Sequence, residues 1–342
     1  MNSSSQNNGL LLGLLPSGFE DLLPPQAEAE YKAIAVLMGV FAQFGYARVK
    51  PPMAEFEDSL LAPGPGAALA ADTFRVMDPV THRMMGLRSD ITAQIARIAL
   101  SRLSAEERPL RLTYANDVIR TRASQARTQR QFMQVGCELI GWDSVEADVE
   151  ICVVALKGLA ALGLSGVTID FALPKIVGDV FKATKTPEDQ IDALRHQLAG
   201  PVETALPALE KIKLPKDAKA HVKRLKAVIS GVRLALNELG LSGFSLTIDP
   251  LETRGFEYHG GVTFTLFSNA LRGELGRGGR YDIYEDGAAR ESAAGFTFYM
   301  DTIRQGLKND ETVKTKTVSK AASWREVQEL QDAGYITIRA KD

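Results

Sequence analysis

Hydrophobic positions follow a helical period in some parts of the chain and a two-residue period in others. Residues 26–44 place apolar side chains on one stripe, which predicts a helix that ends at Gly45. Apolar side chains occupy every second position from Val167 to Leu173, which predicts a half-buried strand. The same reasoning predicts helices at residues 89–103 and 143–162, the second opened by a capping box at Asp143 and Glu146, and strands at residues 46–49, 110–119 and 131–140.

The pattern changes after residue 175. Residues 175–240 have helical periodicity, with Thr186 as an N-cap before Pro187, and we interpret them as a helical insertion. Residues 60–72 are rich in proline, glycine and alanine and predict a mobile loop. The glycine-rich residues 273–279 predict tight turns. Further strands are expected at residues 244–249, 255–258, 262–267 and 336–339, and further helices at residues 297–307 and 323–333.

Strands on both sides of the helical stretch predict an α+β fold, with a mixed, mostly antiparallel sheet flanked by helices. We expect a disordered polar tail at residues 1–14, a core at residues 15–307 that contains the insertion, and a short C-terminal segment at residues 308–342.

Composition narrows the possible functions. The 342 residues carry a net charge of −2, which argues against a protein held to nucleic acid by bulk positive charge. Two cysteines, Cys137 and Cys152, are too few for a disulfide framework, and no spacing of cysteine and histidine indicates zinc. No apolar run is long enough to span a membrane. We therefore expect a cytoplasmic protein without a metal or a cofactor.

The predicted strand at residues 131–140 carries the first candidate site. Alternation places Gln134, Gly136 and Glu138 on the face opposite the apolar residues. A carboxylate and an amide beside a glycine could hold an ammonium group. The alternative is a solvated strand face, and alternation alone favours that alternative.

Three other segments carry candidate residues. Arg254 and Tyr258 would share a face of an extended segment, where the arginine fork suits a carboxylate, although a surface arginine near a Gly-Gly turn is the alternative. Asp90 stands where a helix begins, and an N-cap alone would explain it. The loop with Arg120, Arg122 and Arg127 predicts a site for an anion, such as a phosphate or a nucleotide, or for an acidic patch of a partner, and a solvated loop is the alternative.

Several segments together resemble the histidyl-tRNA synthetase family from about Leu15 to Leu307. They are Gly18–Pro24, Tyr46–Pro52, Leu87–Ala93, Arg120–Gly136, Arg254–Tyr258 and Gly278–Asp282. The resemblance implies a class II aminoacyl-tRNA synthetase-like core that grips histidine. By position, it implies that the amino group is held by Asp90, Thr92, Gln134 and Glu138, the carboxylate side by Arg254, and the imidazole region by Tyr258 and Tyr281.

The sequence departs from that family where ATP would bind. Arg122 stands where the family has a glutamate that reads adenine, and Thr302 stands where an arginine holds phosphate. Tyr299 replaces a glycine and would fill space used by the nucleotide. Because the loss of one such transition-state contact costs about 3 kcal/mol or more, we expect no adenylation. The segment after Lys308 is too short for an anticodon-binding domain, so it reads as a remnant, and no tRNA partner is expected.

These departures resemble the family of ATP phosphoribosyltransferase regulatory subunits in histidine biosynthesis. The resemblance implies a non-catalytic subunit that activates a short-form catalytic subunit and mediates feedback by L-histidine. It also implies a hetero-octamer in which regulatory subunits pair through the synthetase-like core. The alternatives are a divergent, truncated histidyl-tRNA synthetase and a free-standing histidine-binding module.

Overall fold

The structure is a computed structural model. It describes residues 13–124, 127–187, 190–256, 258–285, 288–307 and 314–341. The chain divides into two compact units, Met1–Leu307 and Lys308–Asp342. The tail expected at residues 1–14 lies almost entirely outside the described residues, as do Glu188 and Asp189 of the expected helix start.

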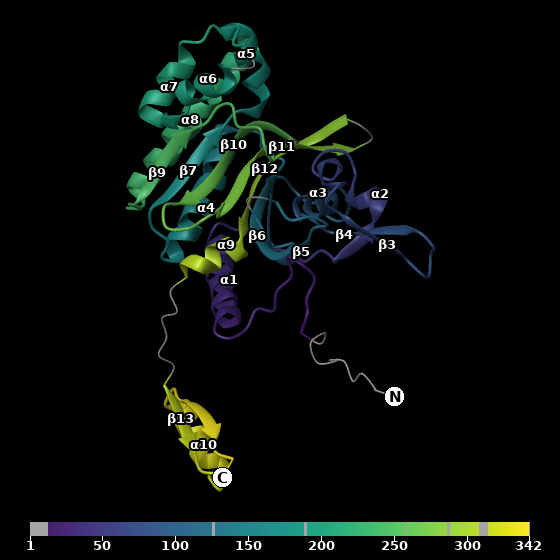
Figure 1. Cartoon of the computed structure of the whole chain (residues 1–342), viewed down its shortest axis with the longest axis vertical. Coiled ribbons are helices and arrows are strands. Elements are labelled where there is room, and N and C mark those ends of the chain that lie inside the picture. Colours follow the sequence, from purple (N-terminus) through teal and green to yellow (C-terminus); the bar gives the residue numbers. More distant parts are fainter. Residues whose placement is uncertain are drawn as a thin grey trace, which may run out of the picture. The chain divides into compact units, whose positions relative to one another are not determined.

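In the described part of the chain, the larger unit is built on a nine-stranded sheet (Figure 1). The strands run in the order β1 (Ala47–Arg48), β5 (Leu110–Ile119), β6 (Gln131–Ile140), β12 (Ala288–Tyr299), β11 (Gly276–Glu285), β10 (His259–Ser268), β7 (Val167–Ala172), β9 (Phe244–Ile248) and β8 (Gly200–Pro201). Only the β1–β5 and β7–β9 pairs of this sheet are parallel. The mixed, mostly antiparallel sheet predicted from the sequence is confirmed.

The central strands form because their side chains alternate between two different environments. β5 and β6 have the predicted bounds and pair in one unbroken register, from Leu110 opposite Ile140 to Ile119 opposite Gln131. On β6, Val135 and Cys137 face the main hydrophobic core, whereas Glu138 lies on the opposite face. This alternation places polar side chains of β6 together on a buried surface.

Helices cover the sheet on both faces. The main core packs α1 (Gln26–Gln43), α4 (Val145–Ala161) and α8 (Lys216–Glu238) against one face. The smaller core on the other face includes α3 (Thr92–Ser101). A small sheet of β2 (Ala54–Phe56), β4 (Met84–Leu87) and β3 (Phe74–Met77) and the short α2 (Glu57–Leu60) lie near α3 (Figure 1). The candidate site lies on this second face.

The region expected as a helical insertion contains α5 (Val177–Thr184), α6 (Ile191–Leu198), α7 (Val202–Glu210) and α8, with β8 between α6 and α7. The first three helices gather at the end of the sheet near β7 and β9 (Figure 1). α8 reaches back along the sheet, where Leu225, Val228 and Val232 join the main core.

Four sequence predictions are wrong in detail. The strand expected at residues 255–258 is absent at the three of them that the structure describes, 255, 256 and 258, because the chain turns at Gly255, whose φ is +76°. The glycine-rich segment does not consist of turns alone, since β11 begins at Gly276 and needs glycines where β12 crosses closely. The helix expected from residue 297 is the short α9 (Met300–Ile303), because β12 extends to Tyr299. α4 is capped by Ser144, whose hydroxyl accepts from the Ala147 amide, rather than by Asp143.

The smaller unit contains β13 (Thr315–Val318), α10 (Trp324–Asp332) and β14 (Ile336–Arg339). β13 and β14 pair in parallel, and the Ser323 hydroxyl caps α10 by accepting from the Glu326 amide. Val318 and Val327 are its buried apolar residues. The strand at residues 336–339 has its predicted bounds, whereas β13 was missed.

Candidate functional site

A cavity of about 250 Å³ opens on the face of the sheet that carries α3. Seven of the ten residues predicted to bind histidine or an anion line it: Asp90, Thr92, Glu138, Tyr258, Tyr281, Arg120 and Arg127. They come from the start of α3, from β6 and β11, from the turn before β10 and from the loop between β5 and β6. The fold therefore gathers residues that are separated by up to 191 positions in the sequence.

Glu138 forms the floor of the cavity. Its carboxyl group accepts hydrogen bonds from the Tyr281 hydroxyl at 2.8 Å and from Thr92 Oγ1 at 3.1 Å. Burial raises the pKa of Glu138 to about 8, because desolvation of the charged form outweighs the stabilising hydrogen bonds. At neutral pH Glu138 is therefore mainly protonated.

Gln134 supports this floor from behind. Its Nε2 donates to Asp90 Oδ2 at 2.8 Å, and its Oε1 accepts from the Ile91 amide at 3.2 Å. Asp90 also accepts from the amide of Thr92, the first residue of α3, at 2.9 Å, and it lines the cavity. Gln134 is fully buried and does not line the cavity; it orients Asp90.

Two glycines make room for the polar floor. A Cβ atom at Gly295 would lie 1.8 Å from Oε2 of Glu138, so only glycine lets β12 pass beside this carboxyl group. Gly136 lies between Gln134 and Glu138 on β6. A Cβ atom there would lie 2.2 Å from the Phe296 carbonyl oxygen and 2.6 Å from the Tyr114 hydroxyl, so neighbouring atoms fill the space beside this glycine.

An aromatic wall stands beside the floor. Tyr258 stacks on His259 with ring centroids 4.2 Å apart, and meets Tyr281 edge-on at 5.7 Å. Burial and the nearby Arg277 guanidinium lower the pKa of His259 to about 3, so this imidazole is neutral. His259 Nδ1 is buried without a hydrogen-bond partner among the described residues. Such an atom is costly to bury unless a ligand or a water completes it.

The structure does not bring Arg254 to the cavity. Its side chain is 81% exposed and is bonded to Glu252, at 2.8 Å from Nη2 and 3.1 Å from Nε. The physical reason is the turn at Gly255, which breaks the extended alternation that would have placed Arg254 beside Tyr258. Burial raises the pKa of Glu252, but the hydrogen bonds from Arg254 and Arg195 outweigh this effect and lower the pKa to about 2.

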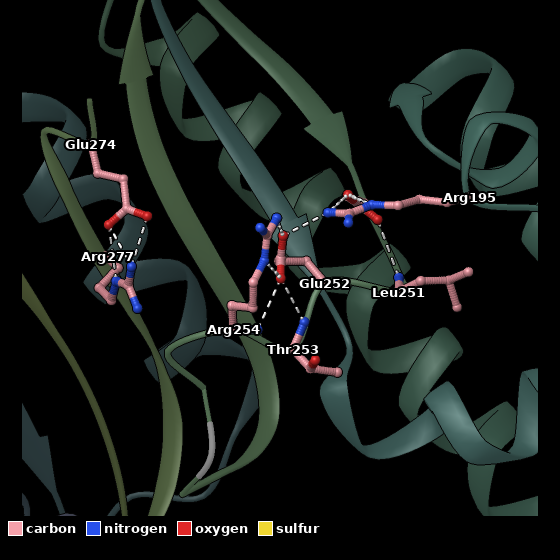
Figure 2. A network of polar contacts seen from close by, with 8 residues as sticks. Arg195, Leu251, Glu252, Thr253, Arg254, Glu274 and Arg277 are labelled. Atoms are coloured by element: carbon pink, nitrogen blue, oxygen red, sulfur yellow. Dashed lines mark hydrogen bonds and ion pairs between the residues drawn. The ribbon is translucent and has the colours of Figure 1, made fainter. Parts of the chain in front are cut away.

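Arg195 ties this turn to the insertion. From α6, it donates to Asp249 at 2.7 Å and to Glu252 at 2.6 Å. Figure 2 shows Glu252 between the two guanidinium groups of Arg195 and Arg254, apart from a second pair formed by Glu274 and Arg277. The position of the turn before β10 therefore depends on a helix of the insertion.

Arg277 is a cavity residue that sequence reasoning missed. It lies on β11 four residues before Tyr281, so the two side chains share a face of the strand. Both line the cavity, together with Glu274, which accepts from Arg277 Nη2 at 2.7 Å. Strand alternation would have found Arg277 if the glycine-rich segment had been taken as a strand.

The three arginines predicted to bind an anion or a partner lie in different surroundings. Arg127 is buried in an ion pair with Asp301, with its guanidinium 4.0 Å from the Tyr299 ring centroid. Arg120 lines the cavity and donates to the Ser89 carbonyl at 3.2 Å. Arg122 is exposed and does not line the cavity.

Two further searches give negative results within the described ranges. No cluster of three or more histidine, cysteine, aspartate or glutamate side chains could hold a metal ion there. Nor does any described helix combine the length and apolar character that a bilayer crossing requires.

Known proteins resemble the chain in sequence and in fold. A family model described as histidyl-tRNA synthetase matches residues 18–200 and 185–303. Curated relatives from Rhodospirillum centenum and Paramagnetospirillum magneticum, both named ATP phosphoribosyltransferase regulatory subunit, are 42% and 41% identical. The two alignments cover 96% of this chain and 89% and 91% of the relatives.

Solved structures support the same architecture. A Bacillus halodurans protein described as an ATP phosphoribosyltransferase regulatory subunit/histidyl-tRNA synthetase matches with a TM-score of 0.78 and 21% identity, over 97% of this chain and 94% of that one. A histidyl-tRNA synthetase from Nostoc matches with a TM-score of 0.73 and 18% identity, over 96% and 86% of the two chains. At these identities the likeness establishes the class II synthetase-like fold.

Proposed function

The chain belongs to the family of ATP phosphoribosyltransferase regulatory subunits, and from that premise we propose that it regulates a catalytic partner and performs no adenylation itself. The partner is a short-form ATP phosphoribosyltransferase catalytic subunit, in a cytoplasmic hetero-octamer whose regulatory subunits pair through the synthetase-like core. L-histidine is the feedback signal. The subunit acts by linkage: histidine that binds the inhibited state more tightly shifts the complex toward it by that difference in affinity.

The single observation that supports histidine as ligand is the cavity itself. Asp90, Thr92 and Glu138 supply acceptors for an ammonium group at one place, and Tyr258 and Tyr281 supply an aromatic wall beside them. Gln134 holds Asp90 in position. The neutral His259 adds to the same wall its Nδ1 atom, which has no hydrogen-bond partner among the described residues. This combination suits a small zwitterion with a polar ring better than a flat apolar ligand.

The surroundings of Tyr299 support the absence of adenylation. Its ring is buried against the Arg127 guanidinium and meets Phe132 edge-on at 5.9 Å. Arg127 is already neutralised by Asp301, so its charge is committed within the protein. We expect no histidine-dependent exchange of pyrophosphate into ATP, and such exchange would favour the divergent synthetase instead.

Histidine binding is tested by calorimetric titration and thermal shift on the full chain. We expect L-histidine to raise the melting temperature, and Glu138→Ala to abolish that rise. Glu28→Ala, which removes an exposed carboxylate from α1, is the matched control and should respond like wild type. The absence of both heat and thermal shift in wild type would refute the cavity as a histidine site.

The regulatory role is tested by co-purification with a short-form catalytic subunit. We expect the complex to transfer phosphoribosyl groups faster than the catalytic subunit alone, and L-histidine to inhibit the complex. Failure to co-purify while histidine still binds would favour the free-standing histidine-binding module.

The arginine-rich loop is proposed as an anion or partner contact. Arg122 is the exposed member of the set, whereas Arg120 and Arg127 line the cavity. We expect Arg122→Gln to weaken complex formation without changing histidine binding. Unchanged complex formation and unchanged nucleotide response in Arg122→Gln and in Arg127→Gln would remove the loop from the proposal.

A further inference from the structure

The cavity contains charges of both signs. The carboxyl groups of Asp90, Glu138 and Glu274 line it, and so do three arginines, Arg120, Arg127 and Arg277. A free amino acid carries an ammonium and a carboxylate, so a cavity that binds one needs a cation available to the carboxylate. The arginine expected for that role from the sequence, Arg254, lies outside the cavity.

The three lining arginines differ in how firmly they are engaged. Arg127 forms a buried ion pair with Asp301, and its guanidinium also lies over two aromatic rings. Arg120 lies over Phe132 and donates to a backbone carbonyl that cannot move without the start of α3. Separating a buried pair such as that of Arg127 leaves an uncompensated charge and is strongly unfavourable.

Arg277 is engaged in a different way. Its acidic partner, Glu274, is only three residues away and lines the same cavity. The carboxylate of Glu274 accepts from Nη2 at 2.7 Å and from Nε at 3.2 Å, which is the two-pronged geometry of an arginine–carboxylate pair. The two side chains remain 24% and 21% exposed, so Glu274 can turn to solvent without being left unpaired in the interior.

The turn before β10 holds the Arg277 guanidinium in place. A Cβ atom at Gly255 would lie 1.4 Å from Arg277 Nη1, so the backbone of the turn lies directly against the guanidinium. The turn is itself fixed by Glu252 and Arg195 (Figure 2). Beside it, His259 Nδ1 is buried and has no hydrogen-bond partner among the described residues, as expected of an atom that a ligand or a water completes.

We propose that Arg277 binds the carboxylate of the amino acid held in this cavity, and that Glu274 occupies the guanidinium until the ligand displaces it. The inference rests on the proposed function, because it assumes that the cavity binds L-histidine. The exchange replaces one carboxylate on the fork by another, so no buried charge is left without a partner.

The test compares L-histidine with histamine, which has the same ring and ammonium group but no carboxylate. Calorimetry on the full chain measures both ligands in wild type, Arg277→Gln, Glu274→Gln and Arg254→Gln. We expect Arg277→Gln to weaken the binding of L-histidine at least tenfold, since hydrogen bonds between charged groups contribute that much to affinity. The affinity for histamine should change less than threefold. Glu274→Gln should bind L-histidine severalfold more tightly, with histamine unchanged.

Arg254→Gln is the matched control, because it removes an arginine of the same surroundings that lies outside the cavity. It should change the affinity for neither ligand by more than twofold. If wild type binds L-histidine but Arg277→Gln changes the affinity for neither ligand, or changes both affinities equally, the inference is wrong and the proposed function stands. If wild type binds no L-histidine, both the inference and the proposed histidine site are overturned. Should Arg277→Gln fail to fold, the decisive quantity is the ratio of the affinity for L-histidine to the affinity for histamine in Glu274→Gln. A ratio unchanged from wild type overturns the inference.

Discussion

Replacing Glu138 by glutamine should change how the stability of the protein depends on pH. The structure buries this carboxyl group on the cavity floor and raises its pKa from 4.5 to about 8. The folded protein therefore keeps a proton that the unfolded chain releases between these two values. Because the unfolded state binds fewer protons in that range, the stability contributed by Glu138 falls as pH rises from about 4.5 to about 8.

The magnitude follows from the two pKa values. Between pH 5 and pH 8, wild type should lose roughly 3 kcal/mol of unfolding free energy relative to Glu138→Gln. The glutamine keeps an acceptor for Tyr281 and Thr92 but has no proton to release. Any loss of packing or hydrogen bonding in the variant shifts its curve by an amount that does not depend on pH, so the difference in slope is the diagnostic quantity.

The assay is urea unfolding at a series of pH values, with circular dichroism as the signal. The control is Glu28→Gln, which changes an exposed carboxylate on α1 and should give the wild-type slope. If wild type and Glu138→Gln lose stability in parallel from pH 5 to pH 8, the reasoning about burial of Glu138 is refuted.

Three further predictions concern the effect on stability of substitutions at His259, Arg127 and Gly295. The pKa of His259 is lowered from 6.5 to about 3, so wild type loses stability as pH falls below 6.5. In urea unfolding, the free energy of unfolding of His259→Gln should therefore rise by roughly 3 kcal/mol relative to wild type between pH 6.5 and pH 4. In calorimetry, Arg127→Met should lower the free energy of unfolding by about 3–5 kcal/mol, because it leaves the buried carboxylate of Asp301 without its partner. Arg122→Met, at an exposed position, should change that free energy by less than about 0.5 kcal/mol. Gly295→Ala should cost about 1–3 kcal/mol by crowding Glu138, and equal melting temperatures would contradict that close approach.

Local patterns in the sequence predicted most of the secondary structure. The bounds of β5 and β6 follow from two-residue alternation, and the same alternation placed Gln134 and Glu138 on the face opposite Val135 and Cys137. Such patterns succeed because the period of a strand or a helix is a property of neighbouring residues. They also predicted the mixed sheet, since strands stand on both sides of the helical stretch.

Two of the predictions that failed, at residues 255–258 and 273–279, depend on backbone geometry at single glycines. The turn at Gly255 sent Arg254 away from the cavity, whereas the glycines after Gly276 allowed a strand that carries Arg277 into it. A glycine is compatible both with a turn and with a strand crossed closely by its neighbour. The choice between them was made by the packing of β12 on β11, which sequence patterning alone does not contain.

The sequence by itself determined the elements, the polar face of β6 and the resemblance to a family. Only the tertiary structure decided which of those polar residues are chemically unusual. Asp301 neutralises Arg127 from 174 residues away, and the pKa of Glu138 rises because β11, β12 and the start of α3 together exclude water from it. Charge pairing and desolvation depend on distance in space, and therefore arise only once the chain has folded.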